Sequence, residues 1–200
     1  MADLSPDDLL PERFRDWFAT RGWAPRQHQL ELLKKTSEGH SCLLIAPTGA
    51  GKTLAGFLPS LVDLTSVHRR PIAGTSHGIR TLYISPLKAL AVDIERNLAK
   101  PVSEMGLKIS IETRTGDTPV HKRQRQKLAP PDILLTTPEQ LALLLASRDA
   151  ARFFSDLKYV IFDELHSLVT SKRGHLLSLG LARLANLRPD LQTIGLSATV

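Results

Sequence analysis

Residues 46–53 read APTGAGKT, a stretch whose residue types could bind the phosphate groups of a nucleotide. They fit the A/G-x-x-x-x-G-K-S/T pattern, and they follow an apolar run and precede a segment of helical character. The glycines allow backbone N–H groups to turn toward a phosphate, and the start of the next helix adds its own N–H groups and dipole. We expect Lys52 to bridge the β- and γ-phosphates and the Thr53 hydroxyl to bind Mg²⁺. The residues predicted to surround the nucleotide here are Thr48, Gly49, Ala50, Gly51, Lys52 and Thr53.

Two carboxylates follow another apolar run. The stretch YVIFDELH, residues 159–166, places Asp163 and Glu164 at the end of a predicted strand. Neighbouring side chains leave a strand end in different directions, so Asp163 could hold Mg²⁺, directly or through a water, while Glu164 orients and deprotonates an attacking water. A charged strand end before a loop is a common alternative. The upstream phosphate-binding pattern favours ATP hydrolysis.

Apolar runs alternate with segments of helical period along the chain, and several runs are apolar at nearly every position. This alternation predicts an α/β domain with a mostly parallel sheet and helices on both faces, whose strand-to-helix loops share one edge. The predicted strands are 42–46, 81–85, 109–113, 133–136, 159–163 and 193–197. The predicted helices are 51–64, 87–100, 119–128, 138–147 and 174–187, with further helices within 5–38 and an exposed loop at 65–80.

Composition narrows the class of protein. Two hundred residues suffice for one domain with a substantial core, and a net charge of +6 favours a polyanionic partner such as nucleic acid. A single cysteine excludes an internal disulfide and a multi-cysteine metal site. No stretch approaches the roughly 20 apolar residues of a membrane span, and the acidic, proline-broken start is not a signal peptide.

Two further loops could bind the backbone of a nucleic acid. Ser85-Pro86 and Thr137-Pro138 each follow an apolar strand, which predicts an N-cap, proline at the first helical position and free N–H groups for a phosphate. Thr137 with Gln140 also fits a capping box. Contacts to the backbone alone carry no base information, as a translocating motor requires. The residues predicted to contact nucleic acid are Ser85, Pro86, Lys88, Arg114, Thr115, Gly116, Thr136 and Thr137.

The alternative for these loops is well-capped helices with ordinary surface charge. The basic run HKRQRQKL, residues 121–128, is most simply a solvated helix face. The stretch SKRG, residues 171–174, could reach either nucleic acid or another domain, and both interpretations stay open.

Several stretches, taken together, resemble the motifs of superfamily 2 DExH-box helicases. APTGAGKT, DELH and SAT resemble motifs I, II and III, and WAPRQHQ resembles the region with the adenine-reading glutamine, which would be Gln29. ISPLKALAVDIERNL, TRTGDTP and TTPEQL resemble motifs Ia, Ib and Ic. The longer stretches, including TSKRGHLLSLGLARL, are most similar to the large-helicase-related family, in particular to bacterial ligase-associated DNA damage response DEXH-box helicases. The resemblance runs from about Arg13 to Val200.

The resemblance implies a RecA-like P-loop NTPase lobe that uses ATP and Mg²⁺. It implies a helical segment with Gln29 over residues 1–38 and the first RecA-like lobe over 39–200, with the second lobe absent from these residues. His166, Ser197 and Thr199 would couple the state of ATP to lobe movement. The partners implied are single-stranded DNA or a 3′-tailed duplex, a second lobe in cis, and a DNA ligase or nuclease. The whole enzyme would move 3′ to 5′ and serve DNA repair in the bacterial cytoplasm, at the nucleoid and not at a membrane.

Three other interpretations stay open. An RNA helicase would carry the same motifs. No residue here can be assigned to sensing a 2′-hydroxyl, so the residues alone do not distinguish DNA from RNA. A nucleotide-dependent switch or small kinase would use the phosphate-binding loop without nucleic acid. The third is a catalytically silent fragment that only binds nucleotide. We expect these 200 residues alone to have negligible ATPase and no unwinding activity. In such motors an arginine from a second lobe completes the site for hydrolysis.

Overall fold

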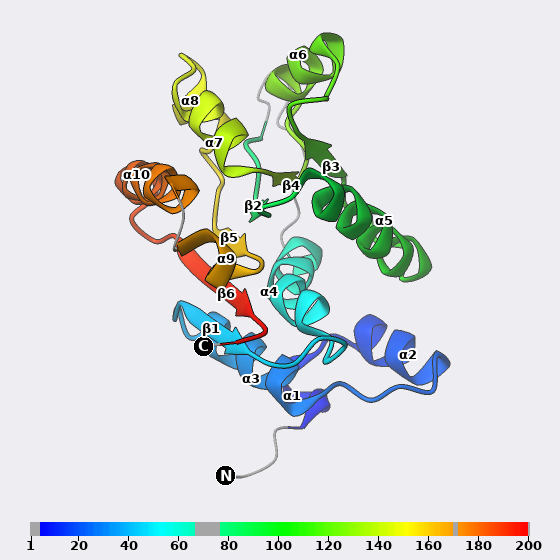
Figure 1. Cartoon of the computed structure of the whole chain (residues 1–200). Helices are drawn as coiled ribbons and strands as arrows, with labels where there is room; N and C mark the ends of the chain where they lie inside the picture. Colours follow the sequence, from blue (N-terminus) through cyan, green and yellow to red (C-terminus); the bar gives the residue numbers. More distant parts are fainter. Residues whose placement is uncertain (1–4, 67–76, 170–171, 200) are drawn as a thin grey trace.

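The computed structural model describes residues 5–66, 77–169 and 172–199, and Figure 1 shows one central sheet between helices. Its six strands lie in the order β1-β6-β5-β2-β4-β3, and every neighbouring pair is parallel. The predicted α/β fold with a parallel sheet is confirmed. The strands are β1 (Cys42–Ile45), β2 (Thr81–Ile84), β3 (Ile111–Arg114), β4 (Ile133–Thr136), β5 (Tyr159–Phe162) and β6 (Gln192–Ser197).

Helices cover both faces of the sheet. The helices are α1 (Pro6–Leu9), α2 (Glu12–Thr20), α3 (Gln27–Ser37), α4 (Lys52–Ser66), α5 (Lys88–Glu104), α6 (Val120–Leu128), α7 (Pro138–Leu145), α8 (Ala150–Phe153), α9 (Leu165–Val169) and α10 (Lys172–Leu187). In the first apolar cluster, the five helices from α1 through α5 pack on one face of the sheet. In the second cluster, α7, α8 and α10 pack on the other face. The N-terminal helices therefore share a core with the phosphate-loop helix α4.

Burial along the strands follows their place in the sheet. Every residue of β2, β4 and β5 is buried, which explains why these strands are mostly apolar, with a threonine at one end of β2 and of β4. The edge strand β1 alternates instead: Cys42 and Leu44 face the first cluster, whereas Leu43 is 58% exposed and Ile45 43% exposed. The expectation of cover on both faces therefore holds for the centre of the sheet and not for β1.

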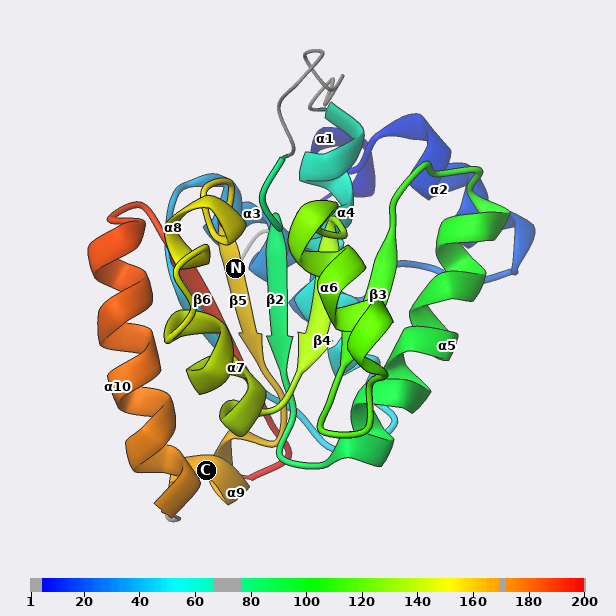
Figure 2. The same ribbon diagram turned by 90° about the horizontal axis from the view of Figure 1, so that it is seen from above.

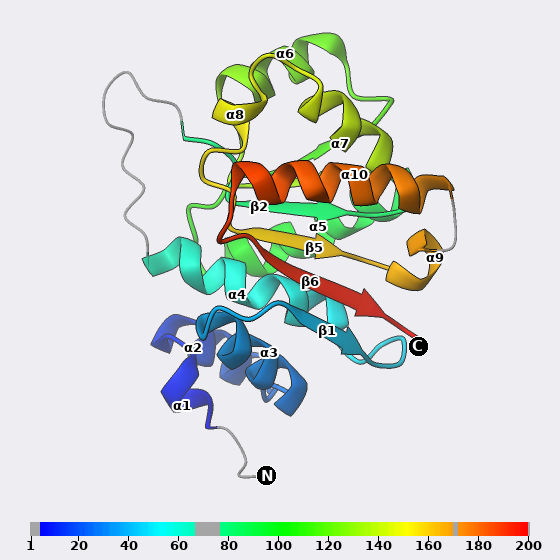
Figure 3. The same ribbon diagram turned by 90° about the vertical axis from the view of Figure 1, so that its left-hand side faces the viewer.

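All six strands end at the same edge, as Figures 2 and 3 show from two directions. The loop between β1 and α4, the turn after β5 and the end of β6 come together there, because parallel strands require a crossover back to the opposite edge. This carboxyl edge is where the predicted chemistry lies.

Ion pairs connect α4 to the central strands at the opposite, amino edge of the sheet. Arg80 and Lys158, directly before β2 and β5, both bind the Asp63 carboxylate near the end of α4, with N–O distances of 2.7 Å and 2.6 Å. Burial alone would raise the pKa of Asp63, but hydrogen bonds and charge from the two cations hold it below its ordinary value. This cluster ties α4 to the two central strands.

Several predicted boundaries differ from the structure. The third strand begins at Ile111 because Ser110 instead bonds the Asp132 side chain before β4. The predicted loop 65–80 is partly helix, since α4 continues to Ser66, while residues 67–76 lie outside the described residues. The short helices α8 and α9 were not expected. Within the described part of the chain, no helix is long and apolar enough to cross a membrane.

The predicted caps are partly wrong. Helix α5 begins at Lys88 and not at Pro86, because the Ser85 hydroxyl donates to the Leu87 carbonyl and accepts from the Leu87 amide in a local turn. Helix α7 does begin with Pro138 after Thr137, but no side-chain cap bond forms and the box with Gln140 is absent. The sequence pattern located the turns correctly and their hydrogen bonds incorrectly.

Candidate nucleotide and nucleic-acid site

The phosphate-binding loop has the backbone shape that its glycines predict. Gly49 and Gly51 have φ angles of +80° and +76°, a region that side chains with a Cβ rarely adopt. An added Cβ at Gly51 would also lie 3.0 Å from the Gln29 side-chain nitrogen. Helix α4 begins at Lys52, so its free N–H groups face the space that the loop encloses.

Lys52 folds back onto this loop. Its ammonium group donates to the carbonyl oxygens of Ala46 at 2.6 Å and Pro47 at 3.0 Å, and the residue is only 9% exposed. In the described part of the chain no carboxylate pairs with Lys52, so its positive charge is compensated by carbonyl dipoles alone. A phosphate would supply the missing negative charge.

Asp163 is held at the end of β5 by two donors. The hydroxyl of Tyr83 donates to Oδ2 at 2.5 Å, and the amide of Glu164 donates to Oδ1 at 2.9 Å. Tyr83 was not expected in the site, because it lies 80 residues away and only the pairing of β2 with β5 brings it near. A lone tyrosine between Leu82 and Ile84 was the signal available in the sequence.

Glu164 has a strained backbone. Its φ of +48° is the single positive value among non-glycine residues that the structure describes. Such a conformation costs roughly 1–3 kcal/mol and tends to occur at functional sites. It separates the Glu164 side chain from that of Asp163, which is buried, whereas Glu164 is half-exposed. The two carboxylates therefore point to different surroundings, as their proposed roles require.

A chain of side-chain contacts leads from Glu164 to the last strand. His166 Nε2 lies 3.3 Å from Glu164 Oε2, and His166 Nδ1 lies 2.9 Å from the Ser197 hydroxyl. Ser197 pairs with Ile45 at the end of β1, directly before the phosphate-binding loop. The Ser197 hydroxyl also contacts the carbonyl and the amide of Thr199. The three residues expected to couple thus lie together beside both predicted nucleotide-binding segments.

Gln29 lies on α3 against the same loop. Its side-chain nitrogen donates to the Gly51 carbonyl at 3.4 Å, and its oxygen accepts from the Arg26 amide at 2.9 Å. Gln29, Gly51 and Trp23 line a cavity of about 420 Å³, within the usual size range of small-molecule sites. An adenine bound here would be next to the phosphate-binding loop.

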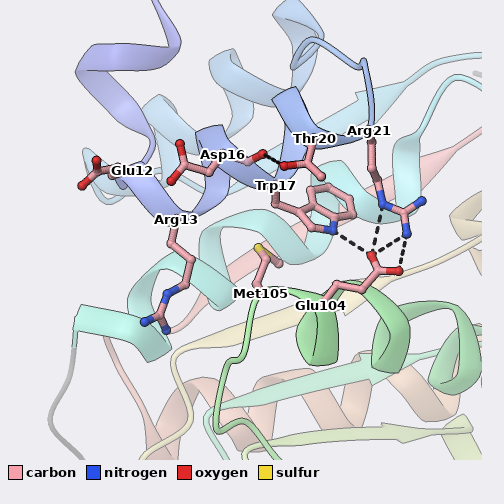
Figure 4. Close-up of a pocket in the computed structure, with 8 residues that line it drawn as sticks. All are labelled: Glu12, Arg13, Asp16, Trp17, Thr20, Arg21, Glu104 and Met105. Carbon is pink, nitrogen blue, oxygen red and sulfur yellow. Dashed lines mark hydrogen bonds and ion pairs between the residues drawn. The ribbon is translucent and has the colours of Figure 1, made fainter.

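An aromatic cluster anchors this region to α5. Arg21 lies over the rings of Trp17 and Trp23, at 5.3 Å and 5.1 Å from their centroids. As Figure 4 shows, Trp17 and Arg21 both bind the Glu104 carboxylate at the end of α5, with a Trp17 Nε1 to Oε2 distance of 2.9 Å. Hydrogen bonds from Arg21 and Trp17 lower the pKa of Glu104, which stays ionised. The cluster fixes Trp23 beside the Gln29 cavity.

The residues present suit Mg²⁺ held by few protein ligands. Thr53 and Asp163 offer the oxygen donors that this ion prefers, and Mg²⁺ commonly uses one or two carboxylates together with substrate phosphates and water. Among the described residues, no group of three or more His, Cys, Asp or Glu side chains could hold a metal by itself. The donor set therefore fits a Mg²⁺–nucleotide complex better than a resident metal ion.

The predicted nucleic-acid residues divide into exposed and buried groups. Lys88 is exposed and pairs with Asp117 at 3.0 Å, over Gly116. Arg114 differs from expectation: it is 6% exposed, donates to the Arg123 carbonyl at 3.3 Å, and has its pKa lowered by burial and by the Arg123 charge. Pro86 is half-buried. The other predicted hydroxyl side chains are buried, namely Ser85, Thr115, Thr136 and Thr137.

Two arginines support this surface. Arg173, from the stretch left open above, donates to the Pro86 carbonyl at 2.9 Å and pairs with Glu139 at 2.7 Å, so it joins the loop after β2 to the first turn of α7. Arg123, in the basic run, donates to the Thr118 carbonyl at 2.7 Å and supports the turn after β3. The Arg173 contact joins residues 87 apart and could not be read from the pattern.

Comparison with known proteins gives one consistent family. Residues 26–200 match the family model described as DEAD/DEAH box helicase. The chain is 45% identical over 197 residues to "Lhr helicase/ probable uracil glycosylase" of Mycolicibacterium smegmatis, covering 93% of this chain and 13% of that protein. It is 44% identical over 171 residues to "ATP-dependent helicase Lhr-Core" of Methanothermobacter thermautotrophicus, covering 81% and 20%.

The fold of a solved structure agrees closely. Mycobacterium smegmatis helicase Lhr bound to ssDNA and AMP-PNP superposes with a TM-score of 0.87 at 42% identity, covering 98% of this chain and 26% of that one. The resemblance to the large-helicase-related family and the RecA-like lobe is thereby confirmed, while the narrower ligase-associated group stays a prediction. The chain spans only 13% to 20% of the length of the two relatives above.

Proposed function

The chain belongs to the DEAD/DEAH box helicase family, and on that premise we propose that it forms the ATP-binding lobe of an ATP-dependent DNA helicase or translocase. Gln29 reads adenine, residues 48–53 bind the phosphates, and Thr53 with Asp163 hold Mg²⁺. The division into residues 1–38 and 39–200 is part of the proposal, with a shared core between the two segments.

The contact chain from Glu164 through His166 to Ser197 is the observation that carries this proposal. A switch that only binds nucleotide has no need to connect its carboxylate to the segment that follows β6. A motor needs such a connection, because hydrolysis must change how two lobes are placed. We therefore assign coupling to His166, Ser197 and Thr199, and expect the second lobe in cis to read their positions.

Hydrolysis would proceed by in-line attack of water on the γ-phosphorus, which breaks its bond to the β–γ bridging oxygen and releases ADP and inorganic phosphate. Glu164 accepts a proton from that water, while Lys52 leaves the Ala46 and Pro47 carbonyls to bind the phosphate oxygens. Mg²⁺, when bound, neutralises the charge that develops on the phosphates. Asp163 and Glu164 thus divide two tasks between neighbouring positions on one turn.

Single-stranded DNA, or a 3′-tailed duplex, is the proposed track. Lys88 and Gly116 offer exposed contacts at the carboxyl edge, Pro86 is half-buried beside them, and Ser85, Thr115, Thr136 and Thr137 shape the loops beneath. The relative of known structure was solved with ssDNA, which supports DNA as the substrate class. Movement 3′ to 5′, a role in DNA repair with a ligase or nuclease, and a place at the bacterial nucleoid in the cytoplasm complete the proposal.

Nucleic-acid stimulation of ATP turnover tests the function. We expect the full-length protein to hydrolyse ATP faster with single-stranded DNA than without it, and more so than with RNA of the same sequence. Stronger stimulation by RNA would favour an RNA helicase, and none by either would favour a nucleotide switch. Residues 1–200 alone should lose about 10³–10⁵ in rate, because the arginine expected from a second lobe is missing.

A further inference from the structure

Tyr83 joins the two predicted Mg²⁺ ligands through the interior of the lobe. Its ring stacks on Phe57 with centroids 5.3 Å apart and 25° between the ring planes. Phe57 follows Thr53 by one helical turn on α4, and residues four apart lie on the same face of a helix. Tyr83 thus contacts α4 with its ring and Asp163 with its hydroxyl.

The register of the sheet makes this contact obligatory. Tyr83 pairs with Ile161 on β5, and side chains alternate between faces along a strand, so Asp163 leaves on the same face two residues later. The Asp163 amide also donates to the Ile84 carbonyl at 3.0 Å, which continues the ladder beyond β5. Position and direction of the carboxylate are therefore set by β2 as much as by β5.

The environment keeps the hydroxyl a donor. Tyr83 and Phe57 are both 0% exposed. The Tyr83 hydroxyl lies 2.5 Å from Asp163 Oδ2, and a phenol O–H donates to a carboxylate oxygen, which only accepts. This donor on Oδ2 leaves each Asp163 oxygen one further lone pair for a metal ion or its water.

We propose that Tyr83 is a positioning residue for Mg²⁺–ATP, whose hydroxyl holds the Asp163 carboxylate in the orientation that receives the ion. This rests on the proposed function, in which Asp163 and Thr53 bind Mg²⁺. Outer hydrogen-bond partners of metal ligands commonly contribute about 10-fold or more to metal affinity. The contact from Phe57 transmits the same restraint to the helix that carries Thr53.

The test is a Mg²⁺ titration of nucleotide binding to the full-length protein. A fluorescent, non-hydrolysable ATP analogue is bound first with EDTA and then with rising Mg²⁺. Tyr83→Phe keeps the ring on Phe57 and removes only the hydroxyl. It should raise the half-saturating Mg²⁺ concentration about 10-fold, while affinity in EDTA changes less than about 2-fold.

Tyr159→Phe is the matched control. Tyr159 is the other tyrosine of these 200 residues, is 3% exposed, and lies at the opposite end of β5 from Asp163. Removing its hydroxyl should leave both the nucleotide affinity in EDTA and the half-saturating Mg²⁺ concentration unchanged. An equal shift with and without Mg²⁺ in Tyr83→Phe, or no shift, would overturn the proposal.

A second variant tests the proposal if Tyr83→Phe does not fold. Phe57→Leu keeps the hydroxyl and removes the stacked ring, so it should raise the Mg²⁺ requirement by a smaller factor and leave binding in EDTA unchanged. No Mg²⁺-specific shift there would contradict the proposal. Failure of the proposed function itself looks different: the unaltered protein would bind no nucleotide with or without Mg²⁺.

Discussion

The two edges of the central sheet hold their charges in different ways. At the amino edge, Asp63 accepts hydrogen bonds from Arg80 and Lys158, and its negative charge offsets part of their positive charge. At the carboxyl edge, within the part of the chain that the structure describes, Lys52 donates to main-chain oxygens and pairs with no carboxylate. The first arrangement holds elements together, whereas the second leaves charge for a ligand. The comparison predicts that neutralising a charge mainly lowers stability at the amino edge and mainly lowers turnover at the carboxyl edge.

Glu164→Gln should have the largest effect. The amide keeps the size of the side chain but accepts no proton, so ATP turnover in the full-length protein should fall by about 10²–10⁴. The free energy of unfolding should change by less than about 0.5 kcal/mol, since Glu164 is half-exposed. Steady-state ATPase and urea unfolding measure the two quantities. Glu12→Gln, at an exposed position of α2, is the control; normal turnover in Glu164→Gln would refute the assigned role.

Asp63→Asn should show the opposite profile. It leaves Arg80 and Lys158 facing a neutral group, and breaking a largely buried pair costs about 3 kcal/mol of unfolding free energy. Turnover per folded molecule should stay unchanged, because the cluster is at the edge away from the nucleotide. Urea unfolding checks the first expectation and ATPase the second. Asp190→Asn, which is exposed, should change neither, and a large loss of turnover in Asp63→Asn would break the comparison.

The contribution of Asp63 should also depend on pH. Its folded pKa lies below the unfolded value, so the stabilisation is complete above the unfolded pKa and is lost as pH falls through the folded pKa. The difference in unfolding free energy between the unaltered protein and Asp63→Asn should hold from pH 7 to about 5 and shrink below about 4. Urea unfolding at each pH measures it. A difference that grows in acid would contradict the sign.

Glu164→Gly should give the smallest effect, and a gain. Glycine adopts a φ of +48° without strain, so the substitution removes a strain energy of roughly 1–3 kcal/mol. Ordering the more flexible glycine offsets part of this gain, and the folded state should be stabilised by about 1 kcal/mol. The same change at Glu31, inside α3, should instead destabilise by about 1 kcal/mol. Chemical denaturation of both variants decides. A loss of stability at position 164 would show that its backbone is not strained.

Local patterns predicted much of the fold and the nucleotide-binding segments. Strand 133–136 was predicted at its observed bounds, and Gly49 and Gly51 have the positive φ that the loop pattern requires. These features depend on a few neighbouring residues, so the sequence contains them directly. The family resemblance gave His166 and Ser197 a shared coupling role, and the structure places the two side chains in contact across 31 residues of sequence.

What could not be predicted depends on register and on distant partners. Tyr83 reaches Asp163 only because β2 pairs with β5 at one particular register, and Glu104 meets Arg21 across 83 residues. Arg114 was predicted to contact nucleic acid, but it is 6% exposed and donates to the Arg123 carbonyl on α6. The Ser85 turn shows a related limit: a hydroxyl before proline fits both an N-cap and a local turn, and α5 starts two residues past the proline.

The cluster of Arg21 with the two tryptophans has a spectroscopic consequence. These 200 residues contain no tryptophan besides Trp17 and Trp23, whose rings lie 5.9 Å apart. Trp23 is 54% exposed and lines the Gln29 cavity, so a base entering there would alter its polarity and quench its emission. All tryptophan fluorescence of these 200 residues therefore comes from the cluster beside the Gln29 cavity. A change in this emission should report nucleotide binding without an added dye.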